Sequence, residues 1–189
     1  SLYCPIYPIV IEMPALLSIQ DCPAWLTTIS SNDHYHHNGQ GIQLLIVETP
    51  LCQAVISLQG SQILSFKPKG QPEMLWLSPV NSYQPGKRIW GGIPLCAPWF
   101  GRHQNPALPI HGFVQNRLWK LQQQSQKESG EVALTFVYTS DSEDLKLFPQ
   151  AFELEFKITL GSRLNMQLKA TNMDQQPMDF SWAFHSFLS

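Results

Sequence analysis

The fold of this chain is best predicted from residues 152–171, which read FELEFKITLGSRLNMQLKAT. Apolar and polar side chains alternate along residues 152–160 and again along residues 164–171, and residues 161–163 form a short glycine-containing connection. Successive side chains of a strand point to opposite faces, so each run offers one face to a core and one to water. We therefore predict a β-hairpin here.

The period of two extends to other parts of the chain. It is found at residues 132–138, and strands also fit residues 42–48, 53–58, 62–66 and 74–77. No window of ten or more residues has the apolar spacing of a helix. We predict an all-β fold, an antiparallel β-sandwich that forms a single domain over residues 1–189. Residues 20–41 are expected to be a loop-rich lead-in, and residues 122–130 a polar hairpin connection.

Composition excludes several classes of protein. The chain has 189 residues, of which 43% are hydrophobic and 14% charged, and its net charge is −2. These values indicate a globular domain and argue against a nucleic-acid partner. Residues 2–17 are apolar, but prolines and Glu12 interrupt them, so no membrane span is expected there. Cys4, Cys22, Cys52 and Cys96 are too widely spaced for a metal or redox motif, and we expect a reducing, cytoplasmic location.

Histidines also gather near the amino-terminal end, in the run His34-Tyr35-His36-His37. Neighbouring positions in a polar loop seldom converge on a metal ion, and no cysteine or carboxylate cluster accompanies them. We expect neither a metal nor an organic cofactor.

One segment departs from strand patterning. Between Pro85 and Arg117, prolines and glycines recur among tryptophan, phenylalanine and histidine residues. Proline removes donors from a strand ladder and glycine weakens it, so this cannot be a regular strand throughout. A long loop rich in aromatic and histidine side chains on a β scaffold predicts a small-molecule site.

Several motifs in and around this segment resemble the glucose-6-phosphate 1-epimerase (hexose-6-phosphate mutarotase) family, which is related to aldose 1-epimerase and galactose mutarotase. They are VISLQGSQILSFKP at 55–68, LWLSP at 75–79, GGIPLCAPWFG at 91–101, PIHGF at 109–113, NRLW at 116–119 and WAFHSF at 182–187. The similarity runs in order from about residue 42 to the last residue. It implies a galactose-mutarotase-like supersandwich that binds a sugar or sugar phosphate on a concave face.

The resemblance also implies a reaction, the interconversion of α and β anomers of hexose 6-phosphates. In this family a carboxylate takes the proton of the C1 hydroxyl while a histidine protonates the ring oxygen, which is paired acid–base catalysis. By position, His185 is the catalytic acid and His111 lines the sugar pocket. The alternation of residues 178–185 places His185 opposite a core face formed by Met178, Phe180, Trp182 and Phe184.

The chain departs from the family pattern at three substrate-binding positions. Trp90 and Gln115 stand where the family has arginines, and Ile110 stands where some members have glutamine. A guanidinium fits a phosphate bidentately, whereas neither tryptophan nor glutamine does. Arg88 offers one replacement, with Arg102 and Arg117 in or near the same segment. Stacking of Trp90 on an unphosphorylated sugar offers another. Substrate binding is accordingly assigned to His111, Trp90, Gln115 and Arg88.

The resemblance places the catalytic carboxylate beyond Ser189. We therefore expect a fold that is incomplete at its carboxyl end, with exposed sheet edges that favour self-association. The leading hypothesis is an isomerase of hexose 6-phosphates or of a close sugar analogue. A non-catalytic carbohydrate-binding or regulatory protein is the alternative, and a degenerate gene product without a ligand is the third possibility.

Overall fold

The computed structural model describes residues 22–189, so the apolar stretch 2–17 and Cys4 lie outside the described residues. The strands are β1 (Leu26–Ser30), β2 (Gln43–Glu48), β3 (Cys52–Ser57), β4 (Ile63–Pro68), β5 (Leu95–Cys96), β6 (Lys120–Gln126), β7 (Val132–Thr139), β8 (Phe152–Leu160), β9 (Leu164–Asn172) and β10 (Ala183–Phe184). The helices are α1 (Ser31–Tyr35) and the 3₁₀ turns η2 (Val114–Asn116) and η3 (Asp144–Lys146).

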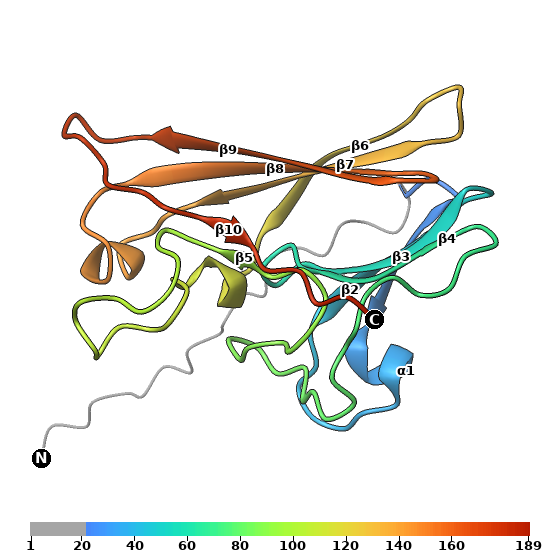
Figure 1. Ribbon diagram of the computed structural model, residues 1–189, viewed down its shortest axis with the longest axis horizontal. Helices are drawn as coiled ribbons and strands as arrows, with labels where there is room; N and C mark the ends of the chain where they lie inside the picture. Colours follow the sequence, from blue (N-terminus) through green and yellow to red (C-terminus); the bar gives the residue numbers. More distant parts are fainter. Residues whose placement is uncertain (1–21) are drawn as a thin grey trace, which may run out of the picture.

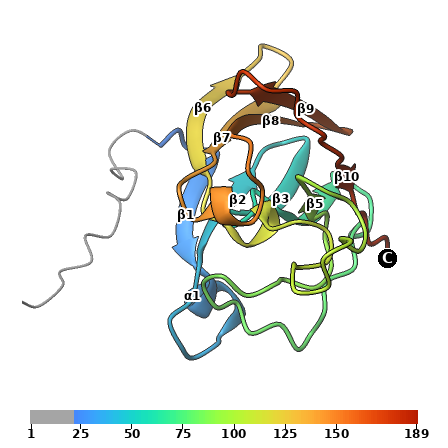
Figure 2. The same cartoon turned by 90° about the vertical axis from the view of Figure 1, so that its left-hand side faces the viewer.

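The strands form two antiparallel four-stranded sheets that pack face to face (Figures 1 and 2). One sheet has the order β1-β2-β3-β4 and the other the order β6-β7-β8-β9. Between them lies the main core, which includes Leu45, Ile56, Phe136 and Phe156. A short ladder of β5 and β10 stands beside the two layers. The predicted all-β antiparallel fold is confirmed.

The hairpin of residues 152–171 forms as β8 and β9. Phe152 pairs with Asn172 at one end and Leu160 with Leu164 at the other, so the pairing runs the full length of both strands. Every second residue of β8, beginning at Phe152, is buried. Burial of the apolar face removes about 25 cal/mol per Å² of apolar surface from water, and this fixes which face of the strand points inward.

Three expectations for secondary structure were wrong in whole or in part. Residues 74–77 make only isolated bridges, from Leu75 to Leu188 and from Leu77 to Gly91. Of the expected hairpin connection 122–130, residues 127–130 do connect β6 to β7, but residues 122–126 belong to strand β6, whose polar side chains are mostly exposed while Leu121 is buried. The lead-in contains β1 and α1.

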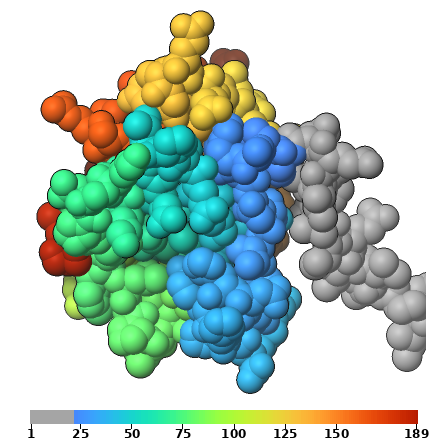
Figure 3. All heavy atoms as spheres, turned by 90° about the vertical axis from the view of Figure 1, so that its right-hand side faces the viewer, coloured from blue at the N-terminus to red at the C-terminus, as the bar shows by residue number. Residues whose placement is uncertain are grey.

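Helix α1 begins at a capping residue. The Ser30 side chain accepts a hydrogen bond from the backbone N–H of Asn32, and His36 ends the helix in the left-handed conformation, with φ 57°. Tyr35 stacks on Tyr83 with ring centroids 4.4 Å apart, which joins α1 to the segment between β4 and β5 (Figure 3, blue beside green). Within residues 22–189 no helix has the length and apolar character needed to cross a membrane.

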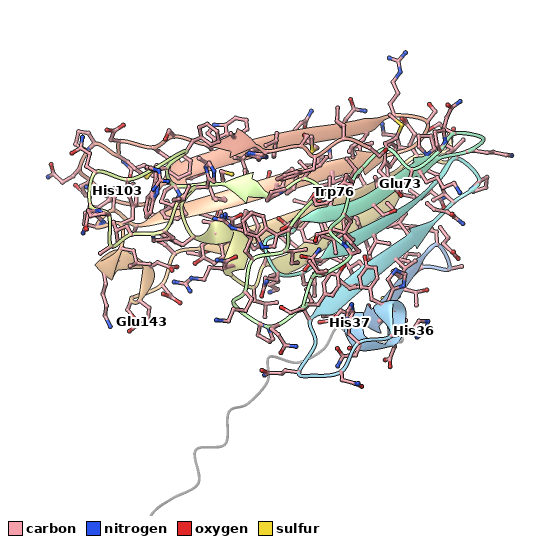
Figure 4. The ribbon with its side chains drawn as sticks, turned by 60° about the horizontal axis from the view of Figure 1, so that its bottom comes forward. His36, His37, Glu73, Trp76, His103 and Glu143 are labelled. Atoms are coloured by element: carbon pink, nitrogen blue, oxygen red, sulfur yellow. The ribbon has the colours of Figure 1, made fainter. Side chains whose placement is uncertain are left out.

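The long connection after β4 is tied to the sheet by Glu73 (labelled in Figure 4). Its carboxylate accepts hydrogen bonds from the Ser65 hydroxyl (2.5 Å) and from the backbone N–H groups of Phe66 and Leu75 (2.9 Å each). Irregular backbone needs such partners because its polar groups have no strand ladder to satisfy them. The connection is thereby held in one place although it contains little regular structure.

Candidate active site

One pocket is lined by all five side chains that the sequence assigned to a site: Arg88, Trp90, His111, Gln115 and His185. Its remaining lining residues are Ile89, Pro94, Cys96 and Phe187. The hollow has a volume of about 60 Å³ and is open to solvent. Ligand sites commonly enclose about 300–1,000 Å³, so a hexose would enter this hollow only in part.

The two histidines reach the pocket from opposite sides of the segment 92–98. On one side the backbone N–H of His185 donates to the Pro94 carbonyl at 3.0 Å, directly beside the β5–β10 ladder. On the other side Phe113 N–H donates to the Ala97 carbonyl at 2.9 Å, beside a bridge between Ala97 and Gly112. Residues 92–98 therefore form the central extended segment that positions both imidazoles.

Side chains of the central extended segment alternate between the core and the pocket. Ile93 and Leu95 are buried in the main core, whereas Pro94 and Cys96 line the pocket. This is the period of two of an extended chain. Burial raises the pKa of the Cys96 thiol to about 11, although the positive charge of Arg88 acts in the opposite direction. The thiol is therefore protonated near neutral pH and is not a nucleophile.

His111 is fixed by a reciprocal pair of hydrogen bonds with Gly101. Its backbone N–H donates to the Gly101 carbonyl at 2.8 Å, and its Nδ1 accepts from the Gly101 N–H at 3.0 Å. An Nδ1 that accepts carries no proton, so the neutral ring has its proton on Nε2. His111 also has φ 69°, a left-handed conformation that is uncommon for a residue with a side chain.

Gly112 allows the backbone that follows His111 to lie very close to the central extended segment. Its φ is 68°, and a Cβ at this position would collide with the Ala97 carbonyl oxygen. Only glycine avoids this contact. The Gly-Gly and His-Gly motifs of the sequence thus reflect close backbone packing.

The rings of His111 and His185 lie 5.6 Å apart between centroids and are inclined by 65°. The pKa of His111 is lowered by burial, by the charge of Arg88 and by His185, in that order. His111 is therefore neutral near pH 7. His185 stacks on Phe187 at 4.7 Å.

Three buried side-chain amides hold the segment that carries Arg88 and Trp90. Gln59 donates a hydrogen bond to the Lys87 carbonyl and accepts one from the Gly86 N–H (2.7 Å each). Gln62 Nε2 donates to the carbonyls of Ile89 (3.2 Å) and Gly91 (2.8 Å). Asn81 accepts from Trp90 N at 2.8 Å and donates to Trp90 O at 2.9 Å. These amides were not identified from the sequence, where nothing distinguishes them from ordinary polar residues.

Gln115, in η2, is 3% exposed, and its Nε2 has no hydrogen-bond partner in the described part of the chain. Arg117, two residues later, does not line the pocket. Its Nε and Nη2 each lie 2.8 Å from Oδ1 of Asp144, a fully buried carboxylate that also accepts from the Tyr138 hydroxyl. Arg117 is thus engaged in a structural network, and Arg102 is exposed outside the pocket lining.

No aspartate or glutamate is among the nine residues that line this pocket. The other four histidines lie elsewhere: His34 is in α1, His36 and His37 are at the α1 end of the molecule, and His103 is at the opposite end (Figure 4). A second hollow of about 330 Å³ lies at the ends of β3 and β4 and includes Lys67 and Lys69 but no histidine. Of these two hollows, the first is the one lined by histidines.

Known proteins show the same combination of fold and motifs. Residues 43–189 match the aldose 1-epimerase family pattern. The chain belongs to the aldose 1-epimerase family. It is 38% identical over 129 residues to an Escherichia coli (strain K12) protein named "Putative glucose-6-phosphate 1-epimerase", covering 68% of this chain and 44% of that protein.

Solved structures of this family superpose on the chain. A Salmonella typhimurium protein titled a "putative mutarotase" has a TM-score of 0.66 and 35% identity, over 69% of this chain and 44% of its own. A galactose mutarotase-like protein from Clostridium acetobutylicum has a TM-score of 0.69 at 16% identity, over 86% of this chain and 53% of its own, which shows the fold alone. The chain spans less than half the length of the curated relative and of the Salmonella structure.

Proposed function

We propose that the pocket binds a hexose or hexose phosphate and that the protein interconverts its α and β anomers, with His185 as the acid that protonates the ring oxygen. The observation that carries this proposal is the meeting of His185 and His111 in one pocket, on either side of residues 92–98. Family membership supports the reaction class. The name of the Escherichia coli relative supports glucose 6-phosphate as the substrate.

The two histidines have different parts in this proposal. His111 is held neutral, with Nε2–H as its available donor, which suits a hydrogen bond to a sugar oxygen. Within residues 22–189 no hydrogen bond holds the His185 ring, so we assign the proton transfer to His185. When the ring oxygen receives that proton, the C1–O5 bond breaks, the C1 hydroxyl loses its proton to a base and an open-chain aldehyde forms. Rotation about C1–C2 and the reverse transfers give the other anomer.

The base in this scheme is a carboxylate, which the nine lining residues do not supply. The same observation favours the second candidate, a carbohydrate-binding protein without catalysis. Trp90 and Gln115, which stand where the family has arginines, also favour the carbohydrate-binding protein.

Exchange NMR between the anomers of glucose 6-phosphate and of glucose tests both candidates. We expect exchange above a protein-free control and a loss of about 100-fold or more in His185→Asn. His36→Asn is the matched control, because His36 is exposed and asparagine tolerates its left-handed backbone. Saturable sugar binding without exchange, unchanged in His185→Asn, would support the binding protein instead. Neither binding nor exchange would reject both.

A further inference from the structure

The segment that carries His185 also touches the loop that leads to His111. Ser181, which precedes His185 on this segment, donates its backbone N–H to the Pro98 carbonyl at 3.0 Å. Its hydroxyl accepts a hydrogen bond from the Phe100 N–H at 3.1 Å. The chain between Pro98 and Phe100 is not a strand, so its polar groups depend on such partners. Ser181 therefore joins the two histidine segments at a second point, beside the β5–β10 ladder.

The residue after Phe100 is Gly101, which fixes the imidazole of His111. The Gly101 N–H donates to Nδ1 of His111 at 3.0 Å, and the Gly101 carbonyl accepts from the His111 N–H at 2.8 Å. The direction of a backbone N–H is set by its peptide plane, and the plane that holds the Gly101 N–H joins Phe100 to Gly101. The Ser181 hydroxyl, which holds Phe100, therefore limits the direction in which the Gly101 N–H points.

The ring of Phe100 gives this contact a second effect on His111. The two rings lie 4.9 Å apart between centroids and are inclined by 31°. Phe100 is 51% exposed, so burial does little to hold it in place. The position of its ring over the imidazole thus depends on the backbone that Ser181 binds.

The exposure of Ser181 argues against a role in core stability. Its side chain lies at the surface, where a hydroxyl that exchanges water for a backbone N–H contributes little to folding. Phe180 and Phe184 pack against the main core, so alternation places Ser181 on the same face as His185. This is the face that borders the pocket, because His185 lines it.

We propose that Ser181 is a positioning residue of this site, which keeps the imidazole proton of His111 on Nε2. The hydroxyl fixes Phe100, Phe100 sets the direction of the Gly101 N–H, and that N–H occupies Nδ1. A neutral imidazole has one N–H, so an occupied Nδ1 leaves Nε2–H as the donor to a ligand. One segment thus places both imidazoles, His185 directly and His111 through Ser181. That this donor meets a sugar oxygen rests on the proposed function.

Nitrogen-15 NMR of the full chain tests this assignment without any sugar. The ring nitrogens of a neutral imidazole resonate according to which one carries the proton, so spectra at about pH 8 report the tautomer of His111. We expect Ser181→Ala to raise the population of the Nδ1–H form about 2- to 10-fold, and to speed hydrogen exchange at the Phe100 and Gly101 amides by a similar factor. Ser181→Thr keeps the hydroxyl and should retain the parent spectrum. Ser186→Ala, an exposed serine on the same segment, is the matched control and should change neither readout.

Anomer exchange of glucose 6-phosphate is measured separately. Where the parent catalyses exchange, we expect Ser181→Ala to lower the rate about 2- to 10-fold and Ser181→Thr to restore it. A parent without exchange would reject the proposed reaction, while the tautomer of His111 still decides the role of Ser181. An unchanged tautomer in Ser181→Ala would overturn the positioning role even if that variant unfolds more easily, because the contact is then purely structural. The same conclusion follows if Ser181→Thr behaves like Ser181→Ala.

Discussion

The imidazoles of His111 and His185 meet at 5.6 Å although their segments hydrogen-bond to opposite sides of residues 92–98. Two backbone contacts produce this arrangement, His185 N–H to Pro94 O and the close approach of Gly112 to Ala97. The histidine pair therefore results from main-chain pairing, in which two segments, one carrying His111 and one carrying His185, each contact residues 92–98.

Electrostatics at this pair can be tested through His111. Its pKa lies below 6.5 in the folded protein, with burial as the first cause and the charge of Arg88 as the second. Because the pKa of His111 is lower in the folded than in the unfolded chain, protonation of this ring favours unfolding. The free energy of unfolding therefore decreases as the pH falls below about 6.5. We expect Arg88→Gln to raise the pKa of His111 part of the way toward 6.5, in an NMR titration of the imidazole. Lys87→Gln should leave it unchanged, and an unchanged or lower pKa in Arg88→Gln would contradict the assignment.

The strands could be predicted where their alternation was strict. Residues 152–160 formed β8 because each apolar position had a place in the core, whereas β6 escaped recognition because its core-facing side is marked by little more than Leu121. The predicted core face of residues 178–184 holds for three of its members. Trp182 is 45% exposed, since the regular pairing there covers only Ala183 and Phe184.

The site was predictable to a different degree. His111 and His185 came from motifs, and Arg88, Trp90 and Gln115 from positions beside them; all five line a common pocket. Sequence patterns cannot reveal that Arg117 is engaged with Asp144, or that buried amides fix the segment of Arg88, because these contacts join residues far apart in the chain. Such partners depend on tertiary packing, which local pattern does not encode.

Gly112 should be the least replaceable glycine near the site. Gly112→Ala combines a left-handed φ of 68° with a collision against the Ala97 carbonyl, so we expect a loss of more than about 2 kcal/mol in the free energy of unfolding. Gly86→Ala is the matched control, because its φ is 72° but nothing lies within 4 Å of the added Cβ. Its cost should be about 1 kcal/mol from backbone strain alone. Equal losses in urea unfolding would show that the close approach to Ala97 is unimportant.

Asp144 should be a major contributor to stability among the acidic residues of this chain. It is fully buried and binds Arg117, the Tyr138 hydroxyl and the Asp141 N–H. Asp144→Asn removes the charge and leaves these donors poorly matched, so we expect a loss of about 3 kcal/mol in the free energy of unfolding. Glu143→Gln changes the adjacent residue, whose ion pair with Lys146 is exposed, and should cost less than about 1 kcal/mol. Similar unfolding midpoints for the two variants would refute the role of the buried network.

Asn81 provides a test of whether the pocket wall is held rigid by its amide. Asn81→Ala removes both hydrogen bonds to the Trp90 backbone and the bond to the Ser78 carbonyl, while it leaves the lining residues intact. We expect a loss of about 2 kcal/mol in stability and much faster hydrogen exchange at the Trp90 amide, because that N–H loses its acceptor. Ser82→Ala, an exposed neighbour, is the control and should change neither quantity. If Trp90 exchange stays slow in Asn81→Ala, the wall is held by packing against β4, and the amide is a consequence of the local structure.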